Sequence, residues 1–130
     1  MTAQVTGLDH LVLTVADVDA TIAFYRGALG MDDVTFGAGR RALTFGDQKV
    51  NLHPAAAPIV PHALRPVAGS ADLCFRTSVP IDEVVAHLRS LGVAIEEGPV
   101  ERTGAVSRLL SVYVRDPDGN LVEISNQLPG

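Results

Sequence analysis

The sequence is poor in the residues that several protein classes need. It contains one cysteine, Cys74, among 130 residues. It can therefore form neither an internal disulfide nor a zinc site built from cysteines. Aromatic residues make up only 5% of the chain. Any metal ion that this protein binds must be held by histidine and carboxylate side chains.

Basic runs and long apolar runs are also missing. Ten Lys and Arg residues are scattered among fifteen Asp and Glu residues, for a net charge of −5. This balance argues against binding to nucleic acid or to an anionic membrane, and favours a small-molecule partner. No stretch approaches the ~18 apolar residues of a membrane-spanning helix, and residues 1–5 lack the pattern of a signal peptide. We therefore expect a cytoplasmic protein.

The composition is that of an ordinary globular protein, with 47% hydrophobic and 19% charged residues. A chain of 130 residues is long enough to bury a core of its own. We expect a single domain over residues 1–130, with a homodimer as the expected assembly.

A strand–helix pattern opens the chain. Residues 8–15 are apolar and β-branched, which predicts a largely buried strand. Asp17 then offers an N-cap side chain, and apolar residues recur at helical spacing up to Gly30, which predicts a helix. Three short extended segments follow, at 33–36, 41–45 and 49–53. This order is βαβββ.

The same pattern returns after a proline-rich segment. Residues 72–77 predict a strand, and a helix opens near Pro80 and ends at Gly92. Extended segments are expected near 94–97, 109–114 and 121–126, with a strong turn at 115–120. Twenty positions separate His10 from Gly30 and Asp72 from Gly92 (30 − 10 and 92 − 72).

The repeated spacing predicts an α+β fold made of two βαβββ modules. Module one covers residues 6–54, module two covers 70–127, and residues 55–69 form the linker. One such module cannot bury its sheet alone, so two would pair. The alternative is two similar but unrelated α+β halves.

Alternation along the strands places polar side chains on the face that no helix covers. Leu11, Leu13 and Val15 point toward the first helix, and the intervening residues point away. The corresponding strands leave four metal-binding side chains on the uncovered face: His10, His53, Asp72 and Glu123. If the modules form a curved mixed sheet around a cleft, with the helices on its outer face, these four side chains would converge.

A metal ion would resolve a conflict in such a cleft. Two poorly solvated carboxylates, here Asp72 and Glu123, repel each other unless a cation lies between them. Imidazole combined with carboxylate suits zinc, nickel, iron(II) or manganese.

Each of these residues also has a simpler interpretation. His10 could be a hydrogen-bonded histidine at the start of a strand, without a metal. Glu123 could be an exposed strand residue without a partner. Asp72 could accept hydrogen bonds from backbone amides at the end of the linker. His53 could be a surface residue at the end of its strand. The other two histidines are expected to be surface residues: His62 in the linker and His87 on the polar face of the second helix.

Three segments together resemble a known superfamily. LDHLVL (8–13), FYRGALGM (24–31) and DPDGNLVE (116–123) look like the signature segments of the glyoxalase, bleomycin-resistance and dioxygenase superfamily, the vicinal oxygen chelate proteins. Within it, the chain looks most similar to the small proteins called glyoxalase domain-containing protein 5. These proteins also resemble the chain at NLH (51–53) and GSADLC (69–74).

The resemblance implies a divalent metal ion bound by the first and last strands of each module. By position the ligands are His10, Asp72, Glu123 and either Asn51 or His53. The chain departs from the superfamily's ring-cleaving dioxygenases and fosfomycin-modifying enzymes, which usually have His in place of Asp72. Glyoxalase I proteins usually have Glu or His in place of Asn51. Both departures weaken a direct transfer of those activities.

These observations favour a metal-dependent enzyme, a lyase, isomerase or dioxygenase, that acts on a small oxygenated substrate. The metal would stabilise an enolate or similar oxyanion. Glu123 would be the catalytic carboxylate, and Arg76, Tyr113 and Asn51 would contact the substrate. The alternatives are a non-catalytic binder of the bleomycin-resistance type, and a domain that kept the fold without activity. The cleft could form within one chain or across a domain-swapped dimer.

Overall fold

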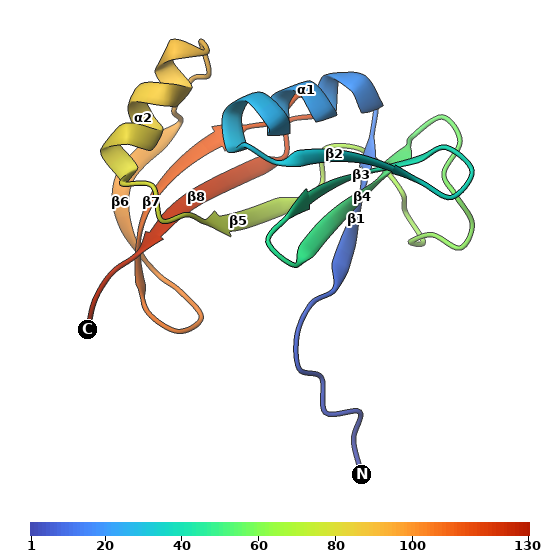
Figure 1. Cartoon of the computed structure of the whole chain (residues 1–130), viewed down its shortest axis with the longest axis horizontal. Coiled ribbons are helices and arrows are strands. Elements are labelled where there is room, and N and C mark those ends of the chain that lie inside the picture. The colour runs from blue at the N-terminus through green and yellow to red at the C-terminus, as the bar shows by residue number, and fades with distance from the viewer. The chain divides into compact units, whose positions relative to one another are not determined.

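The computed structural model describes all residues 1–130 and divides into two compact units, Met1–Ala68 and Gly69–Gly130. Each unit contains one helix and one four-stranded mixed sheet (Figure 1). The predicted α+β fold is therefore confirmed. Residues 55–71 contain neither helix nor strand. Module one and module two below denote these two units.

Module one has the predicted βαβββ order. Its elements are β1 (His10–Val15), α1 (Val18–Leu29), β2 (Asp32–Phe36), β3 (Arg40–Phe45) and β4 (Gln48–Pro54). The strands are ordered β1-β4-β3-β2, with β1 and β4 parallel and the other pairs antiparallel. Helix α1 contacts β2, β3 and β4. The helix and the sheet enclose a core that includes Leu13, Val15, Ile22, Tyr25, Val50 and Leu52.

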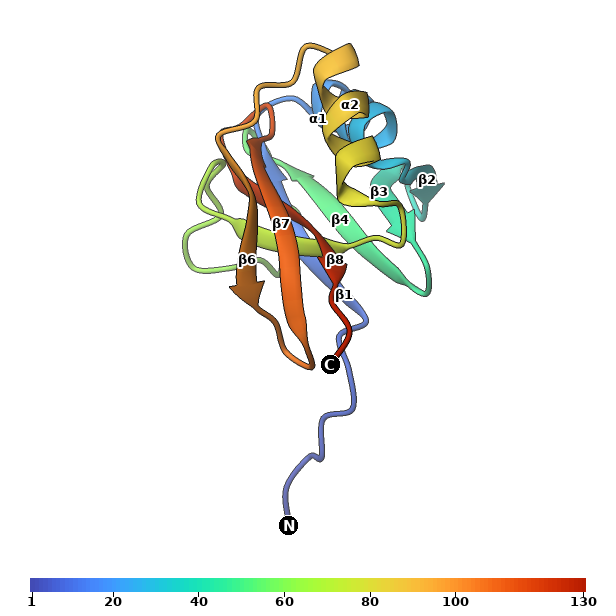
Figure 2. The same cartoon turned by 90° about the vertical axis from the view of Figure 1, so that its left-hand side faces the viewer.

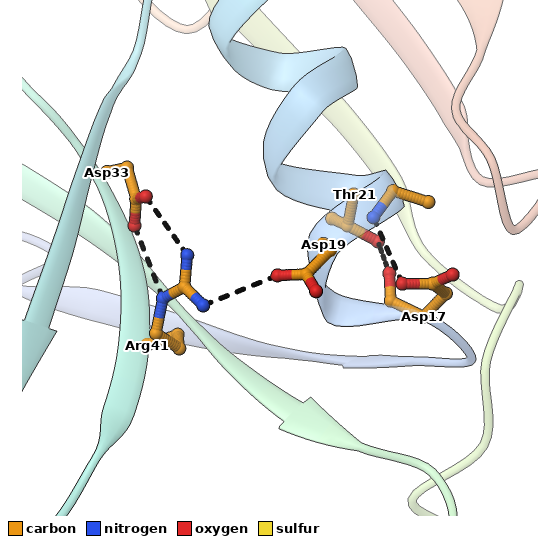
Figure 3. Close-up of polar contacts among 6 residues, drawn as sticks. Asp17, Asp19, Thr21, Asp33 and Arg41 are labelled. Atoms are coloured by element: carbon orange, nitrogen blue, oxygen red, sulfur yellow. Dashed lines mark hydrogen bonds and ion pairs between the residues drawn. The ribbon is translucent and has the colours of Figure 1, made fainter.

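Helix α1 begins and ends where its sequence indicates. The side chain of Asp17 accepts a hydrogen bond from the backbone N–H of Ala20, 3.1 Å away. The hydroxyl of Thr21 donates to the backbone carbonyl of Asp17 (Figure 3). At the other end Gly30 adopts a left-handed conformation with φ 67°, which glycine adopts without steric cost. These local contacts fix both ends of the helix above the sheet.

Module two repeats the topology. Its elements are β5 (Asp72–Arg76), α2 (Ile81–Ser90), β6 (Glu97–Thr103), β7 (Arg108–Arg115) and β8 (Leu121–Gln127). The order β5-β8-β7-β6 again pairs the first and last strands in parallel. Helix α2 packs against β7 (Figure 2). Two modules with one strand order are what the repeated spacing predicts.

The third strand of module two lies later than predicted. We expected an extended segment at 94–97, whereas β6 runs from Glu97 to Thr103. Gly98 and Pro99 conceal this strand, because both residues are unfavourable inside a central strand. β6 is an edge strand with a register shift between Glu97 and Val100, where both residues are tolerated.

The predicted turn between β7 and β8 is held by a buried carboxylate. Asp116 accepts hydrogen bonds from the backbone N–H groups of Asp118 and Asn120 and from the side-chain amide of Asn120. The carbonyl oxygen of the Asn120 side chain accepts a bond from the backbone N–H of Ala71. The turn therefore ties the start of β5 to the start of β8.

Neither helix of the chain combines the length and the apolar character needed to span a membrane.

Candidate functional site

In module one, the predicted site residues lie on the sheet face opposite the helix. In the parallel β1–β4 pair, Val12 lies opposite Asn51 and Thr14 lies opposite His53. His10 lies opposite Lys49. Along β4, Lys49 is two residues before Asn51 and four residues before His53. Since strands rise ~3.3 Å per residue, His10 and Asn51 are separated by about 7 Å along the strands and His10 and His53 by about 13 Å. Asn51 is thus the nearer neighbour of His10.

Asn51 and His53 are buried and lack hydrogen-bond partners. Asn51 is 5% exposed and His53 is 3% exposed. The side-chain oxygen of Asn51 and both ring nitrogens of His53 are buried without a partner. Such atoms cost about 1 to 3 kcal/mol each when left unsatisfied. This excludes the surface interpretation of His53 and leaves these atoms available to a ligand.

His10 is more open and is oriented by its neighbour in sequence. Its side chain is 42% exposed, and its Nδ1 lies 2.8 Å from a carboxylate oxygen of Asp9. A carboxylate only accepts hydrogen bonds, so Nδ1 carries the hydrogen. In the neutral ring the lone pair is then on Nε2, the arrangement common among metal-binding histidines.

In module two, Asp72 and Glu123 also share the face opposite the helix. Glu123 lies opposite Cys74 in the parallel β5–β8 pair, and Asp72 lies opposite Leu121. The two carboxylates are therefore two residues apart on adjacent strands. Asp72 is exposed and makes no hydrogen bond to a backbone amide, because the nearby N–H of Ala71 donates to Asn120. The alternative role of Asp72 as an acceptor for backbone amides is therefore wrong. Glu123 is half-buried.

The carboxylate of Glu123 is surrounded by three side chains that can donate hydrogen bonds. It lies 3.4 Å from the hydroxyl of Ser125, and it also interacts with the Cys74 thiol and the Tyr113 hydroxyl. The hydroxyl of Ser125 also lies 2.6 Å from the hydroxyl of Ser111 and 3.3 Å from the sulfur of Cys74. Burial raises the pKa of the Cys74 thiol, so the sulfur is a protonated neighbour of the site and not a ready nucleophile.

Tyr113 lies beside Glu123 and is held by an arginine that the sequence analysis did not identify. Tyr113 is opposite Glu123 in the β7–β8 pair. Its hydroxyl accepts a hydrogen bond of 2.9 Å from Nε of Arg102, and the guanidinium also lies over the Tyr113 ring. Burial, and then the negative charge of Glu123, raise the pKa of Tyr113. Arg102 was missed because it belongs to β6, the strand that was predicted too early.

Arg76 lies at the end of β5, beside the start of α2. It lines an open hollow with Thr77 and Asn126. The Asn126 side chain accepts a bond from the backbone N–H of Ile81 at the first turn of α2. Arg76 is exposed, so its side chain is accessible to a small molecule.

Each module by itself supplies too few ligands for a complete metal site. No group of three or more His, Cys, Asp or Glu side chains gathers in either module. His10 and His53 belong to module one, and Asp72 and Glu123 to module two. The remaining histidines are exposed as predicted: His62, and His87 on α2. The residues fit a divalent metal in their chemistry, because imidazole, amide oxygen and carboxylate donors all lie on helix-free sheet faces.

Comparison with known proteins agrees with this fold. The chain is 57% identical over 118 residues to the virulence protein STM3117 of Salmonella typhimurium, covering 91% of this chain and 82% of that protein. The crystal structure of that protein superposes with a TM-score of 0.94, at 54% identity, over 95% of this chain and 98% of the other. The glyoxalase domain-containing protein RDO1 of Mycosarcoma maydis is 53% identical over 95% of this chain and 69% of its own length.

A more distant structure has the same fold. The crystal structure of lactoylglutathione lyase from Agrobacterium tumefaciens gives a TM-score of 0.72 at 25% identity, over 95% of each chain. Residues 7–124 match the family described as the Glyoxalase/Bleomycin resistance protein/Dioxygenase superfamily. The repeated βαβββ modules, the polar helix-free faces and these matches agree, and the chain belongs to that superfamily.

Proposed function

We propose that this protein is a metal-dependent enzyme that acts on a small oxygenated substrate. The proposed ligands come from both modules: His10, Asp72 and Glu123, completed by Asn51 or His53. The proposed metal is zinc, nickel, iron(II) or manganese, the cations that imidazole and carboxylate suit together. The proposal includes a homodimer in the cytoplasm, with the site completed within one chain or between two chains.

The observation that carries this proposal is the group of unsatisfied buried atoms in β4. Folding leaves the Asn51 oxygen and the His53 nitrogens out of water and without a hydrogen bond. A folded chain rarely retains several such atoms next to each other unless something binds them. A cation satisfies the amide oxygen of Asn51 directly, and a neutral imidazole binds a cation through either ring nitrogen.

His10 and the two acids support the same assignment. Asp9 holds the proton of His10 on Nδ1, which leaves Nε2 as the donor atom in the neutral ring. Asp72 and Glu123 place two negative charges two residues apart on one face of adjacent strands. A cation offsets their repulsion.

The chain's own residues supply the remaining functions of an active site. A bound divalent cation supplies Lewis-acid stabilisation of negative charge on the substrate's oxygen atoms. Glu123 is the residue that takes up or returns a proton, because its half-buried carboxylate lies beside the Tyr113 and Ser125 hydroxyls. Tyr113 stays protonated, because its pKa is raised, so its hydroxyl can donate its one hydrogen bond either to Glu123 or to a substrate oxygen. Arg76 contacts a polar or negatively charged part of the substrate.

The test is the metal content of protein purified without added metal, measured by elemental analysis. We expect wild-type protein to retain a divalent cation and His10→Ala and Glu123→Gln to lose most of it. Two matched controls remove the same residue types outside the site: His87→Ala on α2 and Glu101→Gln on β6, both exposed. Both controls should retain the wild-type metal content.

Two results would contradict the proposal. The first is an unchanged metal content in His10→Ala and Glu123→Gln. The second is a wild-type protein that binds none of the four cations when they are supplied in excess. Either result would favour the non-catalytic binding protein, which needs no metal.

A further inference from the structure

Two cationic side chains of module one lie over a single aromatic ring. Phe36 ends β2 and lies opposite Arg40, the first residue of β3. The guanidinium carbon of Arg40 lies 5.0 Å from the centroid of the Phe36 ring, and Nζ of Lys49 lies 4.0 Å from it. Each contact is a favourable cation–π contact. Because both are measured from the same centroid, the two charged groups are no more than about 9 Å apart.

This group lies on the same sheet face as the proposed site. Ala42 lies opposite Asn51 in the β3–β4 pair, and Arg40 is two residues from Ala42. Lys49 is two residues from Asn51 on β4. Since alternate residues of a strand share a face, Arg40, Lys49 and Asn51 lie on one side of the sheet.

Neither cation is neutralised within the chain. Arg40 and Lys49 form no ion pair, and Nε of Arg40 is buried without a hydrogen-bond acceptor. The adjacent Arg41, on the opposite face, is bound to Asp33 at 3.0 Å and to Asp19 at 3.4 Å (Figure 3). The chain therefore pairs the arginine that faces the helix side and leaves the one on the site face unpaired.

The net charge of the protein is opposite in sign to the charges of Arg40 and Lys49. The chain carries a net charge of −5, so it repels anions in general. Two cations that contact one ring and have no ion-pair partner repel each other, and an anion that contacts both offsets this repulsion. An oxyanion can also accept hydrogen bonds from the terminal N–H groups of the Arg40 guanidinium.

We propose that Arg40 and Lys49 form an oxyanion-binding subsite that holds a carboxylate or phosphate group of the substrate. This inference deepens the proposed function, on which it rests, by making the substrate a small oxygenated acid. Its reacting oxygens would meet the metal-binding side chains, and its anionic group would meet Arg40 and Lys49. The binding of the anionic group itself needs no metal.

The test is the binding of inorganic phosphate and of acetate to metal-free protein, measured by isothermal titration calorimetry at low salt. We expect wild-type protein to bind at least one of the two anions. The Arg40→Gln/Lys49→Gln double variant should weaken that binding about tenfold or more, as expected when charge-assisted hydrogen bonds are lost. Arg41→Gln removes a positive charge from the same strand and should change affinity by less than about twofold.

The two anions distinguish the chemistry of the group. Binding of phosphate alone identifies a phosphorylated acid, binding of acetate alone a carboxylic acid, and binding of both a general oxyanion subsite. If neither phosphate nor acetate binds, the inference is overturned. An equal loss of affinity in Arg41→Gln also overturns it, because the effect would then be one of general charge.

Two additional variants keep the result interpretable. If circular dichroism shows that the double variant is unfolded, Lys49→Gln alone replaces it, with an expected loss of about threefold or more. His10→Ala separates this inference from the proposed function, because it should lose metal and still bind the anion. Anion binding without metal binding in wild-type protein would refute the metal-dependent function and leave the subsite intact.

Discussion

Asn51 and Glu123 occupy equivalent positions in their modules. Asn51 lies opposite Val12, two residues beyond His10, and Glu123 lies opposite Cys74, two residues beyond Asp72. The module-one counterpart of the Glu123 carboxylate is therefore a neutral amide. Four equivalent positions thus carry one imidazole, one amide and two carboxylates. This set has two negative charges, which match the charge of a divalent cation.

We predict that Asn51→Asp makes the stability of the protein depend on metal. Asn51 is buried, so a carboxylate at this position without a partner should lower the free energy of unfolding by about 2 to 4 kcal/mol in metal-free protein. Added cation should restore that loss, because a carboxylate is a stronger ligand than an amide. Chemical denaturation with and without each of the four candidate metals measures both effects.

Asn51→Ala is the matched control for this variant. It removes the amide without adding a charge, so added metal should stabilise it less than it stabilises Asn51→Asp. If the two variants respond equally to metal, position 51 is not near the cation. His53→Ala in the same series then tests the other candidate for the fourth ligand.

We predict that His53 makes metal-free protein less stable below neutral pH. Burial, and then the positive charge of Arg40, lower the pKa of His53 from its ordinary value of 6.5. The unfolded chain binds a proton at that ordinary value, whereas the folded chain binds it only at lower pH. Between the two pKa values the unfolded state holds more protons, so the free energy of unfolding falls as the pH decreases below about 6.5.

The measurement is urea denaturation at several pH values from about 7 to 5. His53→Gln should reduce the slope of stability against pH, whatever its effect on stability at pH 7. His87→Gln removes an exposed histidine and should leave the slope close to that of wild type. Equal slopes for wild type and His53→Gln would show that the imidazole is not desolvated.

We predict that Asp116→Ala destabilises the protein by about 2 to 4 kcal/mol, because it leaves buried donors of the β7–β8 turn without their acceptor. Asp116 is 6% exposed and accepts three hydrogen bonds of 2.8 to 2.9 Å. Urea denaturation followed by circular dichroism measures the loss. Asp47→Ala, in the exposed β3–β4 turn, should change stability by less than about 0.5 kcal/mol. Similar effects of the two substitutions would contradict the role given to Asp116.

The fold could be predicted because its signals are local. Asp17 and Gly30 mark the ends of α1 through hydrogen bonds and backbone angles that involve only neighbouring residues. Alternation in β1 predicts that Leu13 and Val15 are buried, and both are. β6 was misplaced because Gly98 and Pro99 obscure a strand that only its pairing with β7 reveals.

The candidate site was predicted only as a set of residue types on one face. Alternation puts Asn51 and His53 on the same side of β4, so sequence alone cannot decide which corresponds to Glu123. The register of β1 against β4 decides it. The same holds for Phe36, Arg40 and Lys49, which come from three strands and meet only when those strands pair.

The sequence by itself determined the two βαβββ modules, the ends of the first helix and the faces on which the polar side chains lie. Periodicity, capping residues and turn residues act over a few positions, and each is written in the chain. Only the tertiary structure decided which buried polar atoms lack a partner, which arginine is paired and which is not, and which residues share a register. These properties depend on contacts between distant segments, because burial and strand pairing arise only when the sheet has formed.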